Sequence, residues 1–98
     1  MRNLPYLVLL TAFFALSACE TTPPVQEMSD ARQAIAVAKE AGAAERAAFH
    51  LKAAEDYLAS AETSLGERAY HQARRDAKQA KAKALEALKA SEAAAESQ

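Results

Sequence analysis

Apolar and polar positions divide the chain into two parts with different patterns. Residues 4–16 form a nearly uninterrupted apolar run, which follows the short basic start Met1-Arg2-Asn3. A run of about a dozen residues is shorter than the roughly 20 that a membrane-spanning helix needs. A basic flank, a short apolar core and small residues after it are typical of a secretory signal peptide. We therefore expect residues 1–18 to be a signal peptide that is removed.

The segment after the apolar run resembles the lipobox of bacterial lipoproteins. Leu16, Ser17 and Ala18 give a large aliphatic residue and two small ones before Cys19, the only cysteine in the chain. The resemblance implies cleavage before Cys19, diacylglycerol on its thiolate and acylation of the newly freed amine. The alternative is an ordinary signal peptide that leaves an unpaired thiol, which is uncommon in exported proteins.

Lipid on Cys19 would hold the chain to a membrane. Two or more acyl chains anchor a protein firmly, whereas one binds only marginally, and this class carries three. Glu20 follows the cysteine in place of the aspartate that retains such lipoproteins in the inner membrane of enteric bacteria. The resemblance therefore implies a place in the bacterial cell envelope, at the inner leaflet of the outer membrane and facing the periplasm.

Beyond the lipobox the composition changes to that of a small helical domain. Residues 19–28 contain Pro23 and Pro24, which favour extended backbone, so we expect a short stiff tether there. Residues 29–98 are dominated by alanine, glutamate, lysine, arginine and leucine, which are strong helix formers. We expect one α-helical domain in this part, near the lower size limit for a self-sufficient core.

Two glycines divide this domain into three predicted helices, near 29–41, 45–65 and 69–95. In the last two, apolar residues recur at alternating steps of four and three, which places them on one face of each helix. They are Ala47, Leu51, Ala54, Leu58, Ala61 and Leu65 in the second helix and Ala73, Ala77, Ala80, Ala84 and Ala87 in the third, where Tyr70 and Leu88 join the face at its margin. If these helices pack antiparallel, residues whose numbers add up to about 135 face each other, and large side chains meet small ones. The predicted fold is all-α, a lipid-anchored antiparallel helical hairpin with an additional N-terminal helix.

Charged side chains beside these faces fit the same register. Glu62 and Glu55 on the second helix are expected near Arg74 and Lys81 on the third. Opposite charges at facing positions would stabilise the pairing of the two helices. Agreement between apolar pattern and charge pattern is the main support for the hairpin.

The third helix also carries an excess of positive charge. Residues 68–89 hold seven basic and two acidic side chains, whereas residues 20–67 hold four basic and nine acidic ones. The basic residues on one flank of the alanine face are Arg74, Lys78, Lys81 and Lys89, with Leu85 among them. They either neutralise the second helix and form a solvated face, or form an anion-binding surface for phospholipid headgroups, envelope polymers or an acidic partner.

The sequence offers little for catalysis. His50 and His71 would lie roughly 20 Å apart along the hairpin, too far to share a metal ion. The chain has no glycine-rich phosphate loop and no serine nucleophile motif. We expect no enzyme, no metal, no small-molecule substrate and no cofactor beyond the covalent lipid on Cys19. An envelope location also argues against nucleic acid as a partner.

The layout as a whole resembles a family of short alanine-rich bacterial lipoproteins, the uncharacterised-domain family numbered four-three-nine-eight. The shared features are the lipobox, the proline-containing tether, a first helix that ends in Ala41-Gly42-Ala43 and a last helix that Tyr70 opens. The chain departs from the family with Arg46-Ala47-Ala48, where a proline often stands, and with Arg68-Ala69-Tyr70, where Gly-Asp-Tyr is common. The family has no assigned reaction, so the resemblance implies location rather than activity.

Two functions are compatible with these patterns. In the first, the chain is a membrane-anchored structural or adaptor element that docks another envelope protein or a second copy of itself. In the second, it is an anion-binding module that acts through the basic flank of the third helix. The two differ in their response to salt, since only anion binding depends strongly on exposed charge.

Overall fold

The computed structural model describes residues 22–97, and all regular secondary structure in this range is helical. The elements are α2 (Val25–Glu40), α3 (Ala43–Arg46), α4 (Ala48–Gly66) and α5 (Tyr70–Glu96). The predicted all-α class is therefore confirmed. The predicted signal peptide and the lipobox residues Leu16, Ser17, Ala18 and Cys19 lie outside the described residues.

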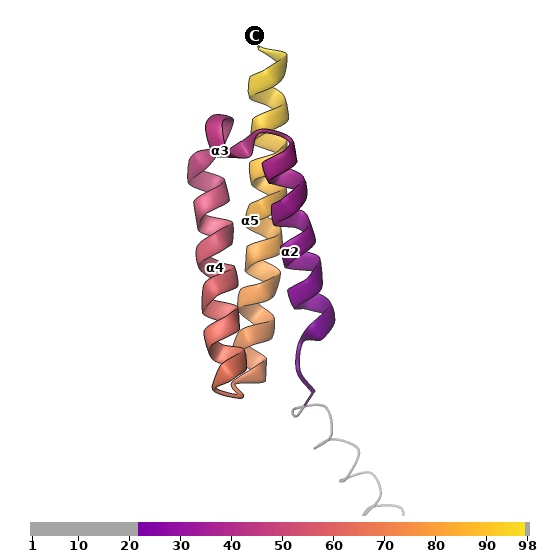
Figure 1. Cartoon of the computed structure of the whole chain (residues 1–98), viewed down its shortest axis with the longest axis vertical. Coiled ribbons are helices and arrows are strands. Elements are labelled where there is room, and N and C mark those ends of the chain that lie inside the picture. Colours follow the sequence, from indigo (N-terminus) through magenta and orange to yellow (C-terminus); the bar gives the residue numbers. More distant parts are fainter. Residues whose placement is uncertain (1–21, 98) are drawn as a thin grey trace, which may run out of the picture.

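The longest helix, α5, forms the spine of the molecule. Figure 1 shows α2 and α4 packed along α5, with α2 running in the same direction as α5 and α4 in the opposite direction. The one-turn helix α3 joins the end of α2 to the start of α4, and the last turns of α5 extend past both. Within the described part of the chain, no helix combines the length and the apolar character that crossing a bilayer requires.

Helix α2 begins four residues earlier than predicted, so residues 25–28 of the predicted tether are helical. Pro24 occupies the N-cap position with φ −81°, and its carbonyl accepts a 3.0 Å hydrogen bond from the Met28 amide. A proline is compatible with a helix start because the amide hydrogen that it lacks would have no helical partner there. Burial of Met28, which packs with Ala61 and Ala77, stabilises the additional turn.

The predicted helix 45–65 is in fact two helices. Gly42 adopts the left-handed conformation (φ 85°), α3 follows for one turn, and Ala47 interrupts the helix at φ −145°. The break directs the Arg46 side chain back onto the end of α2. Its guanidinium donates to the Ala41 carbonyl and, at 3.2 Å, to the Ser91 carbonyl of α5.

Ser91 completes this connection from the side of α5. Its hydroxyl donates to the Ala41 carbonyl at 2.7 Å, and the residue is fully buried. The carbonyl at the end of α2 therefore receives donors from both α3 and α5. Because buried polar groups need such partners, the three elements are fixed to one another at this end.

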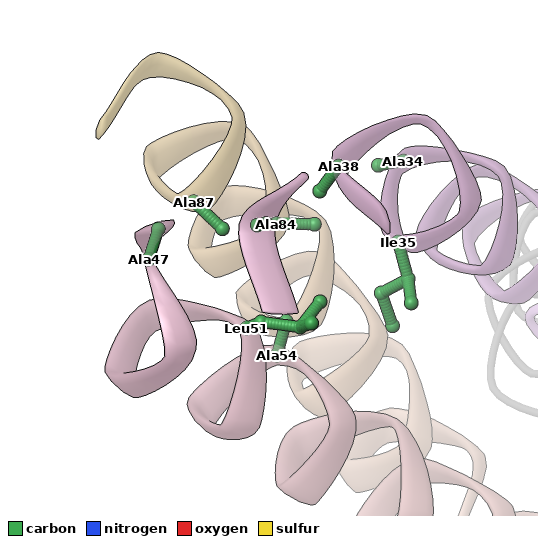
Figure 2. Close-up of a cluster of buried hydrophobic side chains, with 9 residues drawn as sticks. Ala34, Ile35, Ala38, Ala47, Leu51, Ala54, Ala84 and Ala87 are labelled. Carbon is green, nitrogen blue, oxygen red and sulfur yellow. The ribbon is translucent and has the colours of Figure 1, made fainter. Parts of the chain in front are cut away.

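Alanine makes up most of the core. Figure 2 shows Leu51 of α4 and Ile35 of α2 among the small side chains of Ala38, Ala54 and Ala84. These three alanines are fully buried. Small side chains let helix backbones approach closely, so that a few larger ones fill the remaining space. The other fully buried alanines are Ala31, Ala43, Ala61, Ala73, Ala77, Ala80 and Ala87.

The prediction that Glu62 and Glu55 of α4 lie near Arg74 and Lys81 of α5 is wrong. Glu62 pairs with Arg32 at 3.5 Å, and Glu55 pairs with Lys39 at 3.8 Å, both on α2. The two cations are seven residues apart, as are the two acids, so the pairs lie two turns apart between antiparallel helices. Because α2 covers this side of α4, its cations take the positions that were expected for α5.

Polar contacts between α4 and α5 occur on the other side of α4. The Ser60 hydroxyl donates to the buried carboxylate of Asp76 at 2.8 Å, and His50 Nδ1 lies 3.6 Å from a Glu86 carboxylate oxygen. In both pairs the residue numbers add up to 136. Gln72 also donates to Asp76, at 3.0 Å, so that both carboxylate oxygens of this buried group are hydrogen-bonded.

Candidate interaction surfaces

The outer face of α4 carries two exposed aromatic residues. Phe49 is 82% exposed and Tyr57 is 36% exposed, with Ala53 midway between them. Steps of four residues keep all three on the same side of the helix. We call Phe49, Ala53 and Tyr57 the α4 aromatic stripe.

Two shallow hollows accompany this stripe. One has a volume of about 530 Å³ and is lined by Ala48, Phe49, Lys52, Ala53 and Asp56. The other, of about 330 Å³, is lined by Ala53, Asp56, Tyr57 and Ser60. The small alanines leave space beside the large rings, so the surface has room for side chains of a partner.

The polar groups at the edge of the hollows carry no net charge together. Lys52 Nζ and Asp56 Oδ1 lie 3.2 Å apart, one helical turn from each other. The adjacent His50 ring meets Phe49 edge-on, with the ring centroids 5.7 Å apart. The α4 aromatic stripe is thus an apolar surface with a balanced rim, the composition that protein interfaces commonly have.

The structure separates the four predicted anion contacts. Arg74 is engaged within the fold: its Nε lies 3.2 Å from Glu27 Oε1, and its Nη2 donates to the Thr22 carbonyl at 2.9 Å. Lys78, Lys81 and Lys89 are exposed, and none has an ion-pair partner among residues 22–97.

Arg75, which the sequence analysis did not select, lies exposed on the same side of α5 and has Gln72 as its hydrogen-bond partner. We call Arg75, Lys78, Lys81 and Lys89 the α5 basic face. Helical spacing would have identified Arg75, because it precedes Lys78 by three residues. In contrast, the cations of α2 and α4 lie beside acids: Arg32, Lys39 and Lys52 each form an ion pair.

The α4 aromatic stripe was also missed in the sequence. The alanine pattern identifies only the buried face of the helix. Phe49 lies between the buried residues Ala47 and Leu51 in the sequence, but it is on another side of the helix. Two aromatic residues eight positions apart, away from the apolar face, are the signal that could have identified it.

Neither histidine belongs to a metal-binding group in the described range. His50 lies beside Glu86, and His71 is exposed at the start of α5. Within residues 22–97, no three histidine, cysteine or acidic side chains are grouped closely enough to hold a metal ion. What this part of the molecule offers chemically is surface: an apolar stripe on α4 and unpaired cations on α5.

Comparisons with known proteins add no relative to this description. No family model, no curated sequence and no solved structure matches the chain.

Proposed function

We propose that the chain is a lipoprotein of the bacterial cell envelope that acts as a structural or adaptor element, without catalysis. The lipobox at Leu16 to Cys19, after a signal-peptide-like segment, supports a lipid anchor on Cys19. The resemblance to the uncharacterised-domain family of short lipoproteins supports the same compartment. In this proposal the protein lies at the inner leaflet of the outer membrane, and the helical part extends into the periplasm.

The exposure of Phe49 is the observation that carries the adaptor role. Burying a phenylalanine side chain is worth about 1.5–3 kcal/mol, yet this ring is 82% exposed beside a hollow. A partner that covers the α4 aromatic stripe would gain that burial. In this proposal α4 and α5 form an antiparallel hairpin that presents the stripe, and the partner is a protein helix with apolar side chains.

A crosslinking experiment in cells tests the adaptor role. With a photo-reactive residue in place of Ala53, we expect one discrete adduct with an envelope protein. The same residue in place of Gln79, which is exposed on α5, is the control and should give no such adduct. Truncating a residue at the centre of an interface weakens binding strongly, so Phe49→Ser should reduce the adduct about tenfold.

The outcome of this experiment decides between partners. An adduct of twice the mass of the chain would identify a second copy as the partner. An adduct of any other mass would identify a different protein. Phe49→Ser should leave the free energy of unfolding within about 0.5 kcal/mol, because substitutions of exposed residues change stability little. A correctly lipidated chain that gives no discrete adduct from position 53 would refute the adaptor role.

Anion binding is a second candidate function, and a specific observation favours it. Lys78, Lys81 and Lys89 lack acidic partners within residues 22–97, whereas acids of the neighbouring helices are paired with other cations. Unpaired cations on one face attract anionic surfaces, and this attraction falls as the salt concentration rises.

A further inference from the structure

Charge on the exposed surface changes sign along the molecule. At the end of the bundle where α3 lies, the exposed acids without an ion-pair partner among residues 22–97 outnumber the unpaired Lys89; they are Glu40, Glu45, Glu92 and Glu96. The start of α5 lies at the opposite end (Figure 1). Arg75 and Lys78 are near this start, one turn apart, and Asp30 near the start of α2 is an acid there that forms no ion pair among residues 22–97. Glu67 and Arg68, adjacent in the turn before α5, offset each other.

The polypeptide enters the bundle at its basic end. Arg74 holds the Thr22 carbonyl at 2.9 Å and Glu27 at 3.2 Å, so the start of the described chain is fixed against α5. Arg75 follows Arg74 directly. Lys78 lies four residues beyond Arg74, about 6 Å along the helix. The first described residues therefore lie beside the α5 basic face.

The distance from this point to the lipidated residue is limited by covalent geometry. Cys19 precedes Thr22 by three residues, which span at most about 10 Å when fully extended. A lipid anchor on Cys19 would therefore bring the headgroup layer within reach of long basic side chains at Arg75 and Lys78. The acidic end of the bundle would lie farthest from that layer.

We propose that Arg75 and Lys78, the half of the α5 basic face nearest the tether, contact the phosphates of anionic phospholipids in the membrane that holds Cys19. This inference rests on the proposed lipid anchor. The attraction at this end and the repulsion of the acidic end act together to orient the bundle, so that the α4 aromatic stripe is presented at a defined angle. Each basic residue near an anionic surface contributes about fivefold to the population of the bound orientation.

The test uses the full lipidated chain in lipid vesicles. Because Cys19 carries lipid and the chain has no other cysteine, Ala82→Cys provides a single thiol for a fluorophore. Ala82 is exposed on α5, one turn beyond Lys78. With a quencher on the headgroups, quenching should be about twofold stronger in vesicles with phosphatidylglycerol than in phosphatidylcholine alone, and the difference should vanish near 0.5 M salt, roughly where screening reaches only a few ångströms.

A matched pair of variants locates the contact. Lys78→Glu should abolish the additional quenching in anionic vesicles. Lys89→Glu makes the same change of charge on the same helix but about 16 Å farther along it, beyond the roughly 8 Å screening length at physiological salt. It should retain most of the effect.

Three results would contradict the proposal, and each has a distinct meaning. Equal quenching in both vesicle types would overturn the lipid contact and leave the cations for an acidic protein partner. Equal loss in both variants would overturn the placement at Arg75 and Lys78. A chain whose mass shows no acyl groups would overturn the anchor itself, and this inference with it.

Discussion

At the scale of single residues, two left-handed backbone positions end α2 and α4. Gly42 follows α2 with φ 85°, and Arg68 follows α4 with φ 62°. After α4, the Arg68 amide donates to Leu65 and the Ala69 amide to Ser64, the hydrogen bonds of a Schellman motif. Glycine is the usual residue at this position. Arginine therefore occupies a conformation that costs about 1–2 kcal/mol for residues with a β-carbon.

Gly42 has a second constraint, and Gly42→Ala tests it. A β-carbon there would lie 2.5 Å from Arg46 Nη2 and 2.8 Å from its Cζ. The methyl group would displace the guanidinium from the Ala41 carbonyl as well as strain the backbone. We expect the free energy of unfolding to fall by about 1–3 kcal/mol, measured by urea denaturation followed by circular dichroism.

Gly66→Ala is the matched control for this prediction. Gly66 is the last residue of α4, has no positive φ, and a β-carbon there would meet no atom within 4 Å. Alanine in a helical position is more stable than glycine by about 0.5–1 kcal/mol. The two substitutions should therefore change stability in opposite directions, and equal signs would show that Gly42 is not constrained as described.

At the scale of elements, alanine on α5 determines how closely the helices approach. Ala77, Ala84 and Ala87 are fully buried against α2, α3 and α4, and Ala80 of the same helix is also fully buried. A larger side chain at any of these positions would have to separate helices that are already in contact. Close packing of this kind tolerates additional methylene groups poorly.

Ala84→Leu tests this dependence on small side chains. We expect a loss of about 1–3 kcal/mol in the free energy of unfolding, because overpacking forces shifts of the backbone or strained rotamers. Ala82→Leu places the same side chain on the exposed side of the same helix and should change stability by less than about 0.5 kcal/mol. Thermal unfolding of both variants is the measurement, and similar losses would argue against a close-packed interface at Ala84.

The charges between elements follow the positions of the helices rather than the pattern of any one of them. Arg32 and Lys39 of α2 pair with two of the three acids of α4, and Arg74 of α5 pairs with Glu27 of α2. The two pairs between α2 and α4 are about half exposed, and an ion pair on such a surface contributes little to stability. Their effect is on register, since opposite charges meet in only one alignment of the helices.

At the scale of the whole molecule, the helical part is a small bundle in which alanine makes up most of the core. In the proposed function, the anchor on Cys19 compensates for modest affinity, because tethering raises the local concentration of the bundle near its partners. The same anchor would bring the basic end close to the membrane and leave the α4 aromatic stripe free.

Cys19→Ala tests the anchor. We expect this variant to lack acyl groups, to retain residues 1–18 and to be lost from the outer-membrane fraction, as measured by mass spectrometry and membrane fractionation. Ser17→Ala keeps a small residue before the cleavage site and should be processed normally. Normal acylation mass and normal fractionation of the cysteine variant would refute the proposed anchor.

The sequence by itself determined the local properties of the chain, namely its helical class and the apolar face of its helices. Helix-forming composition predicted an all-α domain, and steps of four and three residues identified the buried faces of α4 and α5, including Leu51, Ala77 and Ala84. Both properties depend on neighbours within a few residues. Helix periodicity reports which side of a helix is apolar, without reporting which element covers it.

The tertiary structure alone decided which groups meet. The placement of α2 against α4 gave Glu55 and Glu62 partners on α2, and the contact of Arg74 with Thr22 gave one predicted anion contact a partner within the fold. The same arrangement left Phe49 and Lys78 exposed. Most of these contacts join residues that are 30 or more positions apart in the sequence. Contacts over such separations follow from the packing of three helices together, because a local pattern reports only which side of one helix is apolar.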